Sequence, residues 1–273
     1  MTTRSRSFFG VSRQGLAIGS LAVGFGLAGL LWAAPAQWLA PVVAGISDQI
    51  IHCRRWSGTL RHGRCEQMLS VNGELGAVAW RLDSVAFFPA ALKVDLGWRR
   101  ADSWLQTELA MTDFANESPT FKFFDVRGHL SFPTIRSLLP PVTRKSLGPA
   151  ADAEGALWIQ VSEFTLGAAS PLCAHGQMFV DTLRLPGWPS KVGPVQINLN
   201  QDCASMGGTI QDSGGPLQIA LQFELEEPGM LALRGEISPR PTSAEDWRVL
   251  LALMGPMTAS GGYGVDLSLE WQD

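Results

Sequence analysis

Two hydrophobic patterns divide this chain. No charged residue occurs between Arg13 and Asp48, and the core of that gap, Leu16–Ala34, is 19 residues long. Because an α-helix rises about 1.5 Å per residue, this run roughly spans the hydrocarbon core of a bilayer. Beyond it, apolar and polar residues alternate with a period of two at many places. We therefore expect one membrane-spanning helix followed by a β-rich body.

The alternation predicts a mostly β fold, with a large antiparallel sheet of ten or more strands and one or two short helices. Strands with one apolar and one polar face are typical of antiparallel sheets in which one side faces water or a ligand. Turn residues, for example 226–229, separate the runs. The clearest runs are 92–98, 105–111, 124–132, 157–161, 195–199, 217–225, 231–237 and 265–271.

Two segments have helical spacing instead. Thr242 and Glu245 form a capping box, and a capping box marks a helix start. The residues that follow have one apolar face at helical spacing and then a Gly-Pro pair that ends a helix, so we predict a helix over 242–254. The face consists of Trp247, Leu250, Leu251 and Met254, and the stop is Gly255-Pro256. A shorter helix is expected over Thr134–Leu139, ended by the two prolines that follow.

A divergent tandem repeat is visible in the second pattern. Val126–Ser131 resembles Leu233–Ser238 at an offset of 107 residues, and Leu92–Leu96 resembles Val195–Leu199 at an offset of 103. An insertion of four residues reconciles the offsets, and chance similarity among Gly-rich strands is the alternative. We divide the chain into a basic N-terminus (1–14), a signal-anchor helix (15–36), a linker (37–52), a first β-rich half (53–148) and a second half (149–273).

The charges around the apolar run set its orientation. Arg4, Arg6 and Arg13 all precede it, so the positive-inside rule places the N-terminus in the cytoplasm and the rest outside. A cleaved signal peptide is the alternative, because residues 34–36 have a small-x-small form. The length of the run and Pro35 within that site favour an uncleaved anchor.

Small residues that would let another helix pack closely recur at Gly15, Gly19, Ala22 and Gly26. The alternative is that Gly and Ala are simply common in spans.

The charge after the span argues against nucleic acid and anionic headgroups as partners, because 18 Lys and Arg stand against 25 Asp and Glu there.

Four cysteines lie on the predicted outer side, where disulfides persist. Three pairings are possible. We favour Cys53–Cys65 with Cys173–Cys203, because each half of the repeat holds two cysteines.

Candidate catalytic and metal motifs are weak. Gln211–Pro216 resembles the nucleophile segment of chymotrypsin-like proteases, but His175 lies only 38 residues before Ser213. A hairpin turn with Gly214 and Gly215 is the simpler interpretation. His52, Cys53, His62 and Cys65 match no compact zinc pattern, and no Gly-rich loop has the context of a phosphate site. We expect no enzyme activity, cofactor, metal or small-molecule substrate.

The whole chain resembles protein N of the bacterial type II secretion system. The resemblance rests on the basic N-terminus, the single span, Trp56-Ser57-Gly58, the Gly-punctuated strands, the Trp-Leu-Leu helix and Gly262-Tyr263-Gly264. It implies an inner-membrane, single-pass accessory component with a periplasmic domain. Such a protein would act in the export of folded proteins by binding other secretion components. No site residues carry over.

Two other classes remain open. A periplasmic lipid-binding or lipid-transfer protein fits the same alternation if the apolar face of the sheet is an open groove, and a structural envelope protein is a third class. Exposed strand edges are candidate binding surfaces. Phe87–Pro89 and Phe121–Phe124 are candidates for an apolar patch, with core packing as the alternative.

Overall fold

The structure of the protein is a computed structural model. It describes residues 29 and 33–270, except 72, 88–89, 113–119, 147–150, 168–169, 189, 201–205, 213, 228–229, 242–244 and 254. The predicted anchor helix lies almost wholly outside these residues, as do Gly15, Gly19, Ala22 and Gly26. Among the residues that are described, no helix has the length and apolar character needed to cross a bilayer.

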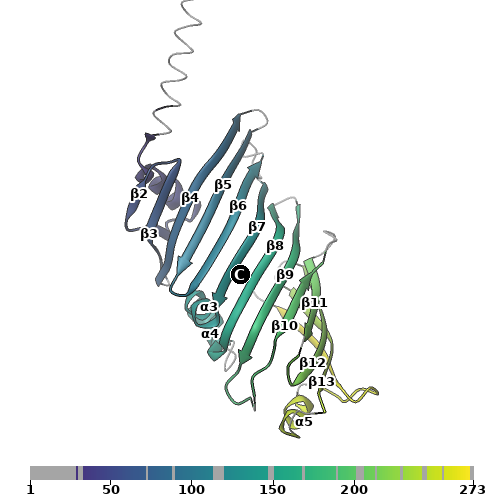
Figure 1. The fold of residues 1–273 in the computed structure, drawn as a ribbon. Coiled ribbons are helices and arrows are strands. Elements are labelled where there is room, and N and C mark those ends of the chain that lie inside the picture. The colour runs from purple at the N-terminus through teal and green to yellow at the C-terminus, as the bar shows by residue number, and fades with distance from the viewer. Residues whose placement is uncertain are drawn as a thin grey trace, which may run out of the picture.

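Within the described residues, fourteen strands form one antiparallel sheet, which confirms the predicted mostly β fold with a large antiparallel sheet. Each strand pairs with its neighbour in sequence, except that β1 and β2 both pair with β3 along the first edge (Figure 1). The strands are β1 (Ile51–Cys53), β2 (Trp56–Gly58), β3 (His62–Ser70), β4 (Gly73–Phe87), β5 (Ala90–Arg100), β6 (Ser103–Thr112), β7 (Thr120–Ser131), β8 (Glu154–Gly167), β9 (Ser170–Arg184), β10 (Val195–Leu199), β11 (Met206–Asp212), β12 (Leu217–Glu227), β13 (Met230–Pro239) and β14 (Tyr263–Glu270).

Short helices lie at three places around the sheet. The helices are η1 (Ala36–Leu39), α2 (Ala40–Ile46), α3 (Phe132–Leu138), α4 (Pro141–Ser146) and α5 (Glu245–Ala252). η1 and α2 contact the first edge, at β1, β2 and β3. α3 and α4 connect β7 to β8 at one end of the sheet, and α5 connects β13 to β14 (Figure 1).

The helix boundaries differ from the prediction for local reasons. α3 begins two residues earlier than expected because Ser131 caps it, its Oγ accepting a hydrogen bond from the Thr134 N–H at 3.4 Å. Pro141 begins α4 instead of ending the preceding helix, since proline is tolerated at the first helical position. α5 lies within the predicted range 242–254, and the proposed cap Thr242 is outside the described residues.

The alternation produces one continuous apolar face across the sheet. Successive pairings place Leu105 of β6, Ile159 of β8, Ile197 of β10 and Val265 of β14 on that face. At the C-terminal end, the buried side chains of β9, β10, β12, β13 and β14 pack with α5 into one core. The sheet therefore curls around α5 and closes its apolar face there.

The N-terminal half of the sheet is different. Among the described residues of β1–β7, Cys65 is the one hydrophobic side chain that is fully buried. The apolar residues of β4, β5 and β6, such as Val78, Val94 and Leu109, are half-buried. In this half, η1 and α2 lie over the apolar face at the first edge, but its side chains stay less buried than those that pack with α5.

The two Arg-Gly segments that resemble each other lie in similar places in the fold. Both copies of the Arg-Gly segment lie in a strand that leads through helix to the next antiparallel strand, in β7 to β8 and in β13 to β14. The strands upstream differ in number, because β6 alone separates β5 from β7, whereas β11 and β12 separate β10 from β13. The two halves are joined directly, since β7 pairs with β8 from Thr120↔Gly167 to Ser131↔Ala156.

Candidate binding surfaces and the disulfide-bonded edge

An apolar hollow lies on the apolar face at the first edge of the sheet. Its volume is about 440 Å³, and its walls come from η1, α2 and strands β1 to β6. Every lining side chain is a leucine, valine, methionine, tryptophan or disulfide cysteine. Trp56 and Trp80 meet edge to face in its wall, with ring centroids 5.8 Å apart. We name this feature the edge hollow.

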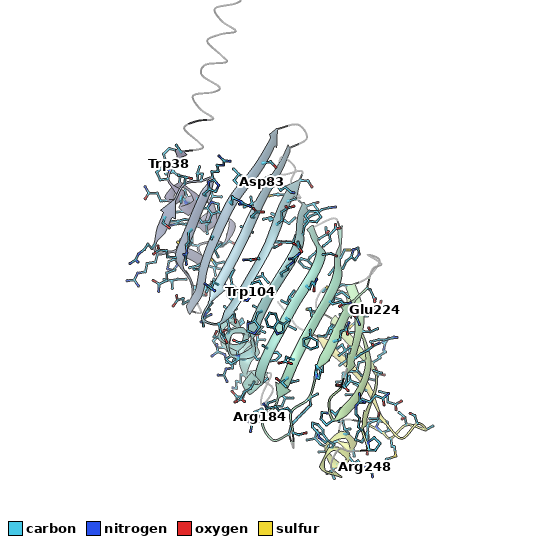
Figure 2. The ribbon with its side chains drawn as sticks, in the orientation of Figure 1. Trp38, Asp83, Trp104, Arg184, Glu224 and Arg248 are labelled. Atoms are coloured by element: carbon cyan, nitrogen blue, oxygen red, sulfur yellow. A yellow bond between two sulfur atoms is a disulfide. The ribbon has the colours of Figure 1, made fainter. Side chains whose placement is uncertain are left out.

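The helical segment η1–α2 forms the roof of the edge hollow and is apolar on both sides. Leu39 and Val43 line the hollow. Trp38 and Val42 point away from it into solvent and are 58% and 52% exposed. Figure 2 shows Trp38 at this corner of the molecule. Ile50, just after α2, is also 49% exposed.

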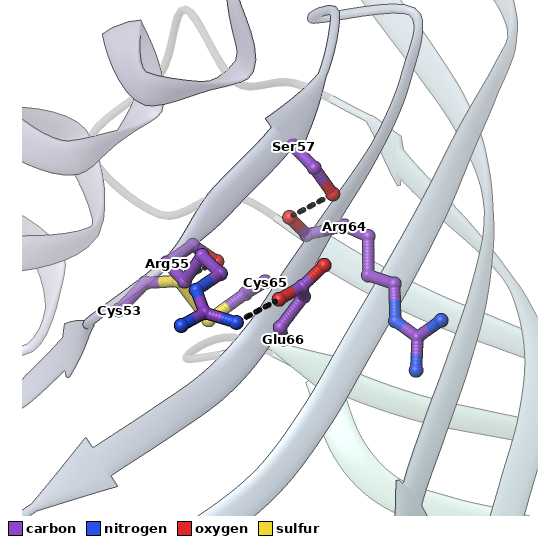
Figure 3. The surroundings of a disulfide bond; sticks show 6 residues. All are labelled: Cys53, Arg55, Ser57, Arg64, Cys65 and Glu66. Carbon is purple, nitrogen blue, oxygen red and sulfur yellow. Dashed lines mark hydrogen bonds and ion pairs between the residues drawn. A yellow bond between two sulfur atoms is a disulfide. The ribbon is translucent and has the colours of Figure 1, made fainter.

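A disulfide fastens the same edge. Cys53 of β1 is bonded to Cys65 of β3, with their Cα atoms 5.8 Å apart (Figure 3). An ion pair between Arg55 and Glu66, 3.2 Å between Nη1 and Oε2, lies beside it. This is the first expected pairing, and it leaves neither sulfur free to ligate a metal. Cys173 is also disulfide-bonded, while Cys203 lies outside the described residues, so the second pairing stays a prediction.

The opposite, polar face carries a row of rings. Trp104 of β6 pairs with His129 of β7, His129 with Trp158 of β8, and Trp158 with Phe179 of β9. The His129 and Trp158 rings lie 4.6 Å apart, and Trp158 and Phe179 are 46% and 37% exposed. Figure 2 shows Trp104 near the middle of the sheet. We name these four residues the aromatic row.

Sequence reasoning missed the aromatic row. Each ring occupies a polar-phase position of its own strand, and only the strand register brings the four positions into line. Two of the four residues, His129 and Trp158, lie at polar-phase positions of the predicted runs 124–132 and 157–161, whereas Trp104 and Phe179 lie outside the predicted runs.

Charged side chains on the polar face are paired across strands. Arg81 contacts Asp95 at 2.5 Å, and Lys93 contacts Glu108 at 2.6 Å. The hydrogen bond to Glu108 raises the pKa of Lys93 above its usual value. Arg81 lies opposite Asp95 in register, which favours this pair, whereas Lys93 reaches Glu108 diagonally because its partner in register is Ala110.

A polar cluster near α3 has a structural role. The Ser131 hydroxyl donates to Asp102 Oδ1 at 2.8 Å, and the fully buried Ser103 donates to the same oxygen at 3.3 Å. The Ser131 bond outweighs desolvation and holds the pKa of Asp102 below its usual value. The nearby His129 Nδ1 lies 3.2 Å from the main-chain oxygen of Asp102, not from the carboxylate. The cluster joins the β5–β6 turn to the start of α3.

The segment that resembles a protease nucleophile is a turn between β11 and β12. Asp212 Oδ1 accepts hydrogen bonds from the N–H groups of Gly214 and Gly215 at 3.2 and 2.8 Å. Its Oδ2 accepts a bond from Arg240 at 2.7 Å. Ser213 lies outside the described residues. The interpretation as a glycine-containing turn fits this geometry.

The other candidates give no reactive site. No group of three or more His, Cys, Asp or Glu side chains is positioned to hold a metal within the described ranges. Phe121, Phe123 and Phe124 are half-buried, and Phe123 contacts Phe164 with 5.8 Å between ring centroids. The side chains of residues 87–89 are outside what the structure describes.

Comparison with known proteins gives one match. The family model described as type II secretion system (T2SS), protein N matches residues 51–266. This range begins at β1 and ends within β14, and the match confirms the resemblance inferred from the sequence. Neither the curated proteins nor the solved structures contain a significant match.

Proposed function

We propose that this chain, which belongs to the type II secretion system protein N family, is an inner-membrane-anchored accessory component of that system. In this proposal the apolar run 16–34 crosses the inner membrane once, with the N-terminus in the cytoplasm and the sheet in the periplasm. The chain assists the export of folded proteins by binding other secretion components, and it performs no catalysis. The family match is the observation that carries this proposal.

The aromatic row supports action through a protein partner. Trp is among the residues that most often dominate protein–protein binding energy, and exposed groups of large apolar side chains mark interaction sites. Trp158 and Phe179 supply such a group on the polar face of the sheet. The β14 edge is a second surface, because β14 pairs with β13 alone among the described strands, and an open edge can accept a partner strand.

Site-specific photo-crosslinking in cells tests the binding role. A photoreactive amino acid at position 158 is expected to give adducts with inner-membrane or periplasmic secretion components. The same residue at position 71 is the control, because Val71 is 78% exposed in the β3–β4 turn and lies outside the aromatic row. Equal adducts at both positions, or none with a secretion component, would contradict binding through this face.

The open apolar face supports a second candidate, a periplasmic lipid-binding or lipid-transfer protein. The specific observation is the edge hollow together with the half-buried apolar residues of β4 to β6. In this alternative the sheet carries lipid instead of steadying a secretion complex. Loss of the protein would then make the outer membrane leaky to detergent while secretion stays normal.

A further inference from the structure

The edge hollow has the size and chemistry of an apolar ligand site. Its volume of about 440 Å³ lies within the range of about 300–1,000 Å³ typical of small-molecule sites. No lining side chain is charged, and none has a hydroxyl or amide group. The indole N–H of Trp80 already donates to the main-chain oxygen of Leu60 at 2.9 Å. The walls therefore favour a ligand segment that needs no hydrogen bonds.

We propose that the edge hollow binds one alkyl chain of a membrane lipid. An alkyl chain brings no polar atoms into the hollow. A peptide would bring an N–H and a C=O group with each residue, and burying these without partners costs free energy. The apolar face continues beyond the hollow, since Leu109 of β6 lies directly opposite Phe123 of β7. A chain longer than the hollow would follow this half-buried face across the sheet.

The position of the hollow indicates where the lipid comes from. Its roof, η1–α2, follows directly on the apolar run 16–34. The roof exposes Trp38 and Val42 on its outer side, and an aromatic ring beside a span is typical of the membrane–water interface. This inference rests on the proposed membrane anchoring, because the anchor would hold the hollow against the outer leaflet of the inner membrane. A lipid chain would then pass from bilayer to sheet beneath the roof.

Photolabelling of the full chain tests the proposal. The purified protein is reconstituted into vesicles of phosphatidylethanolamine and phosphatidylglycerol that contain a phospholipid with a diazirine on its acyl chain. After illumination, adducts are mapped by mass spectrometry. The expected result is saturable labelling of the hollow residues, for example Val43, Val78 and Val94, in addition to labelling of the span.

Two variants and a control make the test specific. Val94→Trp fills the hollow and is expected to lower the apparent affinity of the hollow for lipid by roughly tenfold. Ala79→Trp is the matched control, because Ala79 is exposed on the opposite face, between Val78 and Trp80, and its labelling should equal that of the wild type. If Val94→Trp does not fold, Val43→Asp places a carboxylate in the roof and leaves the strands unchanged.

Three outcomes would overturn the proposal. In the first, the adducts are confined to the span and the outer side of η1–α2. In the second, the hollow is labelled equally in the wild type and in Val94→Trp. In the third, a second copy of the chain occupies the hollow and keeps the labelled phospholipid out. The readout is lipid contact and does not depend on secretion. A protein that is labelled in the hollow but is dispensable for secretion would contradict only the proposed function. A protein that is needed for secretion but is not labelled in the hollow would contradict only this inference.

Discussion

The carboxylate of Asp212 is fully buried at the β11–β12 turn and stays charged there because of its partners. Burial acts to raise its pKa, but the hydrogen bond from Arg240 and those from the N–H groups of Gly215 and Gly214 together hold the pKa below its ordinary value of 3.8. A carboxyl group whose pKa is lower in the folded state stabilises that state above its unfolded pKa. The contribution is lost as the pH falls through the folded value.

Asp212→Asn is therefore expected to lower the free energy of unfolding in a pH-dependent way. The loss at pH 7 should be about 2 kcal/mol, since charge-assisted hydrogen bonds are removed. It should shrink as the pH drops below the ordinary pKa of 3.8, where the carboxyl group of the unfolded chain takes up a proton, and disappear below the lower pKa of the folded state. Urea unfolding followed by circular dichroism, repeated from pH 7 to pH 2, measures the free energy of unfolding of the variant and of the wild type at each pH.

Asp266→Asn is the control for this experiment, because that side chain is 85% exposed in an ion pair of 3.6 Å. Its effect should stay within about 0.5 kcal/mol at all pH values. A difference between Asp212→Asn and the wild type that is constant down to pH 2 would contradict the account of Asp212.

Individual residues were predictable from the sequence where the pattern was local. Trp247 and Leu251 were assigned to the buried face of a helix, and each is 1% exposed. Arg240 was not linked to Asp212, because their contact joins residues 28 apart in the sequence. Contacts of this kind depend on the register between strands, which the alternation alone does not fix.

At the scale of elements, the disulfide fixes the first edge of the sheet. β1 and β2 are only three residues each and pair with β3 alone. Short edge strands with a single neighbour open easily, and Cys53–Cys65 holds them on β3. The same bond lines the edge hollow, so it also keeps β1 and the roof in place.

Removing this bond with the double substitution Cys53→Ser and Cys65→Ser should lower the free energy of unfolding. Closing a loop of 12 residues contributes about 3 kcal/mol in the chain-entropy model. Hydrogen exchange should also show lost protection of β1 and β2, whereas β8 and β9 keep theirs. Ser57→Ala at the same edge is the control, and unchanged protection of β1 in the double variant would count against this role.

Elements were predicted well where periodicity or capping was strong. The long runs of period two became strands, and α5 lies inside its predicted range. α4 was missed because two consecutive prolines were interpreted only as a helix end, although the second can begin a helix. η1 and α2 were missed because residues 37–52 were assigned to a linker, and their short apolar run has no distinctive period.

For the whole molecule, one sheet presents two different faces. The apolar face packs against α5 at the C-terminal end and holds the edge hollow beneath η1–α2 at the first edge, whereas the polar face carries the aromatic row. The sequence predicted the sheet and the two-faced strands. It left the open or closed state of the apolar face undecided, because that depends on how far the sheet curls and on where the helices pack.

The most direct measurement for the whole account is deletion of the gene in the native bacterium. The proteomes of the culture supernatant and of the periplasm are compared with those of the wild type and of a strain complemented with the full chain. We expect folded exoproteins to disappear from the medium and to accumulate in the periplasm, and we expect the complemented strain to restore their export. Normal secretion in the deletion strain would contradict a role in type II secretion. Normal secretion together with an outer membrane leaky to detergent would favour the lipid-binding function instead.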